Sequence, residues 1–314
     1  MKVLVTGGAG FIGSHLCKQL LEEGYEVICL DNFDAYYEPM LKRGNITPLL
    51  NNKGFQLIDG DISNYKLVSE VIHSGVDYVF HYAARAGVRA SLEDSVNTHH
   101  VNATGTLNML VACLDSKITK FINASSSSVY GRVSYLPFNE VHPQNPISPY
   151  AVSKLAAEHY CRVFSETHSL PVVSLRLFNV YGPRIRPDLA ISIFTRQALK
   201  GEIIQIFGDG SKTRDCTYID DVVKANLIVM KNRKSNGKVY NIGGGNSLSI
   251  NELAEKIIKI TRSKSKVIHT NSKQGDVDHT WANIEKARQE LGWQPRTDID
   301  SGLNKYLKHV TGIE

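Results

Sequence analysis

The chain has 314 residues, of which 42% are hydrophobic and 21% charged, and its net charge is +5. This length allows one or two domains, and the composition is that of a globular protein, which excludes the disordered, collagen-like and disulfide-scaffold classes. No apolar run approaches the ~18 residues of a membrane-spanning helix, and the apolar start at residues 3–5 stops too early for a signal peptide. We expect no membrane association.

The charge pattern and the cysteine content indicate which partners and which cellular compartment to expect. Positive charge is spread along the chain without a basic stripe, so we expect no nucleic-acid partner, whereas small phosphorylated ligands suit the mild positive balance. The five cysteines, at positions 17, 29, 113, 161 and 216, are odd in number and lack C-x-x-C spacing. We therefore expect neither a disulfide framework nor a metal site, and we expect a cytoplasmic location.

Short apolar runs alternate with helical segments through the first half of the chain. Strands are expected at residues 3–5, 26–30, 55–58, 78–80, 121–122 and 172–177, and helices at residues 11–23, 61–74, 101–114 and 149–167. Nearly continuous apolar runs are typical of parallel strands that are covered on both faces. The alternation predicts an α/β fold with a doubly wound parallel sheet of the Rossmann type.

Beyond about residue 178 the order is less regular, with short strands at 203–206 and 239–241 and about three helices. We predict two domains. Residues 1–178 form the Rossmann domain, and residues 179–314 form a smaller mixed α/β lobe. Part of residues 213–242 is expected to belong to the first domain again.

A glycine-rich loop joins the first expected strand to the first expected helix. Gly7, Gly10 and Gly13 allow a tight turn and a close approach of the backbone to a pyrophosphate, and Phe11 and Ile12 place helix N-terminal N–H groups beside it. A P-loop is excluded because Ser-His, and not Lys-Ser/Thr, follows the last glycine. Glycines that serve packing alone are the alternative.

Asp31 ends the second expected strand, 18 residues after Gly13. A carboxylate at this place accepts hydrogen bonds from the adenosine ribose and repels a 2′-phosphate, which favours NAD over NADP. Asn32 follows it and is assigned to the same cofactor site. A helix N-cap role for Asp31 is the alternative, and both roles can coexist.

The spacing of these glycines resembles that of the short-chain dehydrogenase/reductase superfamily. In that family an Asp-Ile or Asp-Val pair after the third strand contacts adenine, and Asp61 and Ile62 match it. The segment 81–84 matches the loop that passes the cofactor phosphates, so the resemblance also implies Ala83 and Ala84 as cofactor-binding residues.

Tyr150 and Lys154 lie four residues apart and so share one face of a helix, behind the serine-rich segment 125–131. Lys154, with a positively charged nicotinamide, is expected to lower the pKa of Tyr150 from about 10 toward neutrality. Tyr150 could then remove a hydroxyl proton, with Ser126 as hydrogen-bond partner and proton relay. Both Tyr150 and Lys154 are also assigned to the cofactor site. A surface tyrosine and lysine on an amphipathic helix are the alternative.

The whole chain resembles extended short-chain dehydrogenases that act on nucleotide sugars. Asn179 matches a family residue near the substrate diphosphate, and Arg214 matches an arginine that grips the nucleotide phosphates. Asp276 matches a late loop beside the nucleotide. Relatives often carry arginine three residues before it, where this chain has Lys273, which weakens a bidentate phosphate contact there.

The residues after Ser126 separate the reactions of this family. Dehydratases of nucleotide sugars typically have Asp-Glu there and UDP-glucuronate decarboxylases a Glu, whereas this chain has Ser127 and Ser128. Without an acid or base for elimination, the resemblance favours a 4-epimerase.

Two further segments, 31–43 and 182–190, resemble UDP-glucuronate 4-epimerases. The substrate carboxylate of such an enzyme needs a charged partner, and Arg186 is our candidate, with Ser127 and Ser128 as additional donors. Arg89 is expected to face the sugar or its phosphates. For both arginines a surface ion pair is the alternative.

The resemblance therefore implies an NAD-dependent enzyme that interconverts UDP-glucuronate and UDP-galacturonate through a 4-keto intermediate. UDP-glucose 4-epimerase, UDP-glucuronate decarboxylase and a non-catalytic NAD-sensing regulator are the alternatives, in that order. A homodimer with a four-helix interface is expected from the resemblance alone.

Overall fold

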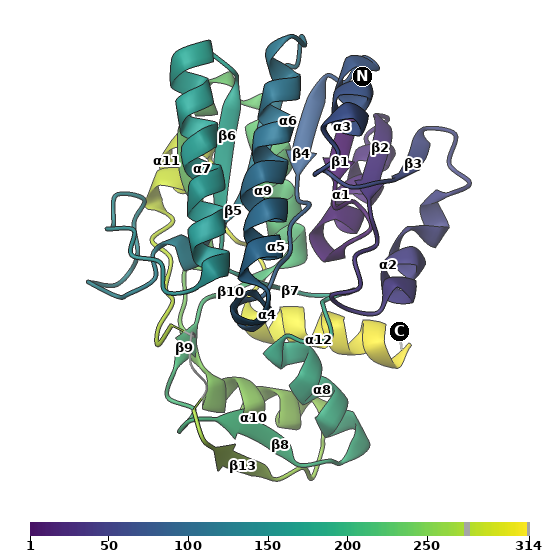
Figure 1. The fold of residues 1–314 in the computed structure, drawn as a ribbon. Coiled ribbons are helices and arrows are strands. Elements are labelled where there is room, and N and C mark those ends of the chain that lie inside the picture. Colours follow the sequence, from purple (N-terminus) through teal and green to yellow (C-terminus); the bar gives the residue numbers. More distant parts are fainter. Residues whose placement is uncertain (273–276, 313–314) are drawn as a thin grey trace.

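The computed structural model describes residues 1–272 and 277–312. Its centre is a seven-stranded sheet in the order β11-β6-β5-β4-β1-β2-β3, and every pairing in it is parallel (Figure 1). The predicted doubly wound sheet is thus confirmed. The strands are β1 (Lys2–Thr6), β2 (Glu26–Asp31), β3 (Phe55–Asp59), β4 (Tyr78–His81), β5 (Lys120–Ser126), β6 (Val172–Leu177) and β11 (Lys238–Ile242).

Helices cover both faces of this sheet. One face carries α3 (Tyr65–His73), α6 (Gly105–Leu114) and α7 (Pro149–His168), and the other carries α1 (Phe11–Glu22) and α9 (Ile219–Lys231) (Figure 1). Because helices cover both faces, most side chains of the central strands are apolar and buried. All five cysteines are buried and free.

Strand β5 is longer than the predicted residues 121–122. Its second half contains Asn123, Ser125 and Ser126, which interrupt the apolar pattern although all are buried. Asn123 is accommodated because its amide donates to the hydroxyl of Ser174 on β6 at 3.1 Å. A buried polar group is tolerated in a sheet when it forms a hydrogen bond. The hydrophobic pattern therefore predicts a strand shorter than the one in the structure.

Two helices differ from the predicted bounds. The helix predicted at 61–74 begins at Tyr65, because the side chain of Asn64 caps it by accepting from the backbone N–H of Leu67 at 3.2 Å. The helix predicted at 101–114 is α6, which continues from α5 (Ser95–His99) through a π-helical segment, His100–Thr104.

A smaller part of the fold lies at the carboxyl end of the sheet, at the bottom of Figure 1. It contains α8 (Ala190–Lys200), α10 (Ile250–Thr261), α12 (Ile299–Thr311) and three strand pairs: β7 (Asn179–Tyr181) with β10 (Cys216–Tyr218), β9 (Thr213–Arg214) with β12 (Leu248–Ser249), and β8 (Ile204–Phe207) with β13 (Val267–Thr270). The remaining helices are α2 (Pro39–Ile46), α4 (Val88–Glu93) and α11 (Glu285–Leu291). The predicted division at residue 178 stays a prediction, and β11 of the later half pairs with β6.

The order of the strands determines where a ligand can bind. From β1 the chain proceeds to β2 and β3 on one side and then to β4, β5 and β6 on the other, so the order reverses between β1 and β4. In doubly wound sheets the ligand crevice lies outside the carboxyl ends of the strands at this point. Within residues 1–272 and 277–312, no helix is long and apolar enough to span a membrane.

Candidate active site

A cavity of about 970 Å³ opens at the carboxyl ends of the strands, at the reversal point. All but one of the predicted site residues line it: Gly7, Gly10, Phe11, Ile12, Gly13, Asp31, Asn32, Asp61, Ile62, Ala83, Ala84, Arg89, Ser126, Ser127, Ser128, Tyr150, Lys154, Asn179, Arg186 and Arg214. Asp276 lies outside the described residues. The structure thus brings together residues from both halves of the chain.

The glycine loop has the shape of a phosphate cradle. Gly7 has a φ of 66°, and a Cβ added to it would lie 2.7 Å from the backbone nitrogen of Ala83. A Cβ on Gly13 would collide with the carbonyl oxygen of Gly7. The first turn of α1 has no acidic residue, and its N-cap, Gly10, has no side chain that could cap the free N–H groups. The helix end can therefore receive an anion. These residues fit a dinucleotide pyrophosphate.

Asp31 lies at the end of β2, and its carboxylate forms hydrogen bonds with the two neighbouring loops. Its carboxylate accepts from the backbone N–H of Phe33 at 2.9 Å and from that of Ala9 at 3.0 Å, while burial raises its pKa. The alternative N-cap role is wrong, because the helix that follows begins after Glu38, whose side chain caps it. Asn32 donates to Asp61 at 2.7 Å, which joins the loops after β2 and β3 at the edge of the cavity.

The capping of α7 positions the predicted catalytic residues. Ser148 is the N-cap and accepts from the backbone N–H of Ala151 at 3.2 Å, so Tyr150 falls in the first turn and Lys154 one turn later. Tyr150 and Ser126, at the end of β5, line the same cavity, and the hydroxyl of Ser126 favours the ionised phenol. The alternative of a surface pair is wrong, because both side chains line the cavity and Lys154 is buried.

The electrostatics of this pair differ in part from the expectation. The pKa of Tyr150 lies above its usual value and not below it, because burial raises it more than the hydroxyl of Ser126 and the charge of Arg186 lower it. Lys154 donates to the carbonyl oxygen of Ala124 at 2.8 Å, and burial lowers its own pKa to about 8. In the structure Arg186 is therefore the cation that favours ionised Tyr150, and the predicted effect of Lys154 stays a prediction.

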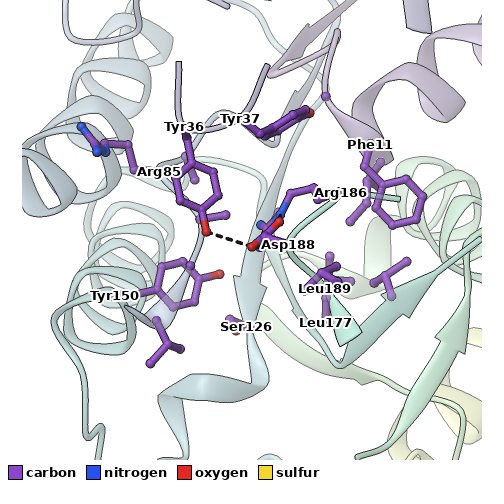
Figure 2. Close-up of a pocket in the computed structure, with 18 of the residues that line it drawn as sticks. Phe11, Tyr36, Tyr37, Arg85, Ser126, Tyr150, Leu177, Arg186, Asp188 and Leu189 are labelled. Atoms are coloured by element: carbon purple, nitrogen blue, oxygen red, sulfur yellow. Dashed lines mark hydrogen bonds and ion pairs between the residues drawn. The ribbon is translucent and has the colours of Figure 1, made fainter. Parts of the chain in front are cut away.

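Arg186 lies inside the cavity but already has a carboxylate partner. Its guanidinium binds Asp188 twice, from Nε at 3.0 Å and from Nη2 at 2.9 Å, and Asp188 also accepts from the hydroxyl of Tyr36 at 2.9 Å. Figure 2 shows the rings of Tyr36 and Tyr150 one above the other, with both hydroxyl groups toward Arg186 and Asp188. The ion pair proposed as the alternative exists, yet it lines the cavity and is not a surface pair.

The other predicted substrate residues lie around the same space. The guanidinium of Arg89 on α4 lies over the ring of Phe207 at 5.3 Å from its centre. Arg214 donates to the carbonyl oxygens of Thr213 at 2.8 Å and Asp278 at 3.2 Å. Ser128 donates its backbone N–H to the hydroxyl of Ser126 at 3.1 Å, which fixes the turn after β5.

Sequence reasoning missed a buried network behind the serines. The hydroxyl of Ser125 donates to Glu158 of α7 at 2.6 Å, and Glu158 pairs with Arg176 of β6, whose Nη2 lies 2.6 Å from Oε1. Arg176 also donates to the hydroxyl of Tyr130 at 3.0 Å. This network ties α7 to β5, the strand that ends at Ser126, and to the neighbouring strand β6. A charged residue within the apolar run of β6 was the available signal.

Tyr36 and Asp188 were also not singled out as site residues. Both lie in the segments 31–43 and 182–190, whose resemblance to UDP-glucuronate 4-epimerases was noted. The resemblance therefore marked the right segments, and only the structure shows which side chains in them meet.

The comparisons with known proteins agree with this geometry. The chain matches the family described as GDP-mannose 4,6 dehydratase over residues 4–306. A UDP-glucuronate 4-epimerase from Thermodesulfobacterium geofontis is 38% identical over 96% of this chain and 94% of its own length. A Bacillus subtilis protein described as an uncharacterized UDP-glucose epimerase is also 38% identical, over 100% of this chain and 99% of its own.

A solved structure extends the match to three dimensions. The crystal structure of UDP-glucuronic acid 4-epimerase from Bacillus cereus, in complex with UDP-glucuronic acid and NAD, shares 39% identity, covers 100% of both chains and has a TM-score of 0.95. The predicted resemblance is thus confirmed. The chain belongs to the GDP-mannose 4,6 dehydratase family, within the extended short-chain dehydrogenases/reductases.

Proposed function

We propose that this protein is an NAD-dependent nucleotide-sugar 4-epimerase that interconverts UDP-glucuronate and UDP-galacturonate. The observation that carries the proposal is the position of Arg186, a guanidinium inside the cavity whose charge acts on Tyr150. A cation beside the reacting group suits a sugar acid better than a neutral sugar. Relatives named UDP-glucuronate 4-epimerase, and one of them bound to NAD, support the same reaction.

Tyr150 is the proposed acid–base residue. Its phenol takes the proton of the 4-hydroxyl group, with Ser126 holding the same oxygen and relaying the proton. NAD, when bound in the cradle formed by the glycine loop, supplies the hydride chemistry at C4. Lys154 of α7, whose ammonium group donates to Ala124 near the carboxyl end of β5, is assigned to hold the cofactor ribose and to favour the ionised phenol.

The carboxylate of the sugar is assigned to Arg186, Ser127 and Ser128. When C4 is a ketone, the sugar is a β-keto acid, which can lose CO₂ by cleavage of the C5–C6 bond, leaving an enolate that takes a proton from water. Hydrogen bonds to the carboxylate favour its charged form and oppose this loss. The serines carry no acid or base, so elimination is not assisted.

We expect Arg186→Ala to raise the share of UDP-4-ketopentose among the products on the order of 10-fold, the rate effect of about 1.4 kcal/mol. The reason is that the carboxylate of the ketone intermediate loses its charged partner. Mass spectrometry of the products from UDP-glucuronate checks this. If the wild-type protein releases as much ketopentose as Arg186→Ala, Arg186 does not protect the carboxylate.

A UDP-glucose 4-epimerase is the second candidate, favoured by the Bacillus subtilis relative described as a UDP-glucose epimerase. An NMR time course separates the two, with the purified protein, no added NAD, and UDP-glucuronate or UDP-glucose as substrate. Conversion of the acid to UDP-galacturonate supports our proposal and a retained cofactor. Conversion of UDP-glucose alone would contradict the role of Arg186, and inactivity on both, persisting with added NAD, would favour a regulator.

We also propose a homodimer in the cytoplasm. Val152, Tyr160 and Val163 share one face of α7 and are 49%, 39% and 39% exposed, and on the neighbouring α5 Val96 is 83% exposed. Apolar side chains grouped on adjacent helices are typical of a subunit interface. Five free, buried cysteines suit a reducing compartment.

A further inference from the structure

A chain of three side chains crosses the active-site cavity. Tyr36 comes from the loop after β2, and Arg186 and Asp188 come from the segment between β7 and α8. The hydroxyl of Tyr36 donates to Oδ2 of Asp188 at 2.9 Å across 152 residues of sequence (Figure 2). The link therefore joins the cofactor side of the cavity to the substrate side.

Asp188 occupies only one edge of the Arg186 guanidinium. It accepts from Nε at 3.0 Å and from Nη2 at 2.9 Å. A guanidinium has five N–H donors in a rigid plane, so this pairing leaves three of them, including both on Nη1, for a second acceptor. The ring of Tyr36 lies against the same guanidinium, 5.4 Å from its carbon, and restricts its rotation further.

The protonation states of Tyr36, Arg186 and Asp188 allow these hydrogen bonds. Although burial opposes it, the pairing with Arg186 and the hydroxyl of Tyr36 hold the pKa of Asp188 below its usual value, so Asp188 is ionised. Burial raises the pKa of Tyr36 to about 12, so its hydroxyl remains a donor. Without Asp188, Arg186 would be a long, flexible cation in the cavity, free to adopt other rotamers.

We propose that Asp188, held by Tyr36, is a positioning residue for Arg186: it fixes one edge of the guanidinium and leaves the other edge for the carboxylate of a nucleotide-sugar acid. This inference rests on the proposed function, and it adds the residues that make the acid preferred over the neutral sugar. Asp188 also offsets the charge of Arg186, which limits how much that charge favours ionised Tyr150.

The test measures binding by calorimetry with the NAD-containing protein, in a Tyr150→Phe background that prevents turnover. The probes are UDP-glucuronate and UDP-glucose. We expect the unaltered site to prefer the acid by about 10-fold or more, the value of one charge-assisted bidentate contact. Arg186→Met should abolish the preference. Asp188→Asn and Tyr36→Phe should each reduce it about 3- to 10-fold, with the affinity for UDP-glucose unchanged.

Tyr37→Phe is the matched control, because this neighbouring phenol forms no hydrogen bond through its hydroxyl within the described part of the chain, and it should keep the preference. An unchanged or larger preference in Asp188→Asn and Tyr36→Phe overturns the proposal, as does an equal loss of affinity for both probes, which would mark a merely structural role.

A pH profile of kcat/KM with Tyr150 intact gives an independent readout. The titratable or charged groups near Tyr150 are Lys154 on its own helix, Tyr36 from the loop after β2, Arg85 from the loop after β4, and the Arg186–Asp188 pair. In Asp188→Asn the charge of Arg186 is no longer offset, so the acidic limb should move to lower pH by up to about one unit. A limb that does not move, or moves to higher pH, counts against the proposal.

The two proposals fail separately. If the wild-type protein prefers the acid but does not epimerise it, the proposed reaction is wrong and the positioning role stands. If it epimerises UDP-glucuronate while Asp188→Asn and Tyr36→Phe retain the full preference, the reaction stands and the positioning role is wrong.

Discussion

Replacing Tyr150 by phenylalanine should lower kcat for the epimerisation of UDP-glucuronate about 10²- to 10⁴-fold, the usual contribution of a positioned acid–base group. The substitution removes only the phenol hydroxyl, which lies in the cavity with Ser126. The ring, the capped first turn of α7 and the cofactor cradle remain. We therefore expect KM for UDP-glucuronate to change little, because the lost interaction acts in the chemical step. Initial rates measured by chromatography of the two UDP-sugars check this.

The control for this experiment is Tyr160→Phe, which removes a hydroxyl from the same helix at a partly exposed position. It should leave kcat unchanged. A Tyr150→Phe protein that keeps its NAD and its thermal stability but retains more than about a tenth of the wild-type kcat would show that another group moves the proton.

The second large effect concerns stability. Glu158→Ala should lower the free energy of unfolding by about 3–5 kcal/mol, because it leaves the guanidinium of Arg176 as an uncompensated buried charge. The pair is almost fully enclosed, with side-chain exposures of 4% for Glu158 and 2% for Arg176. Ser125 would lose its hydrogen-bond acceptor in the same variant. Urea unfolding followed by circular dichroism measures the change.

Glu166→Ala on the same helix is the matched control. Glu166 pairs with Arg162 at 2.8 Å, but the two side chains are 59% and 50% exposed. Exposed pairs contribute about 0–1 kcal/mol, since water solvates and screens both charges. Equal destabilisation by Glu158→Ala and Glu166→Ala would mean that burial of the Glu158–Arg176 pair is energetically unimportant.

The fold and much of the site could be predicted because their signals are local in sequence. Gly7, Gly10 and Gly13 follow a strand and open a helix, and Tyr150 and Lys154 share one helix face. Each of these patterns is complete within a few residues, so its chemistry can be recognised before the chain is folded. The assignment of a Rossmann sheet rested on the same kind of local alternation.

Contacts between distant segments could not be predicted in this way. Tyr36 and Asp188 meet only because the loop after β2 and the segment before α8 face one cavity. Glu158 and Arg176 meet because α7 packs on β6. No spacing rule encodes such pairs. The polar residues that lengthen β5 are unpredicted for the same reason, because Asn123 bonds to Ser174 on β6 and Ser125 bonds to Glu158 on α7.

These distant contacts also bear on the proposed substrate. The cradle, the phenol and the lysine suit any 4-oxidation of a nucleotide sugar, and in our proposal Arg186 and the residues around it decide between an acid and a neutral sugar. The local motifs thus specify the chemistry, while the pairing of Arg186 with Asp188 and Tyr36 bears on the substrate.

The most direct test of the account uses UDP-glucuronate that carries deuterium at C4, incubated with the purified protein in ordinary water. Reversible oxidation at C4 returns the same hydrogen to the same carbon. We therefore predict UDP-galacturonate that keeps its deuterium at C4, together with little UDP-pentose. Loss of the label to solvent, a pentose as the main product, or no conversion would contradict C4 epimerisation of UDP-glucuronate by this protein.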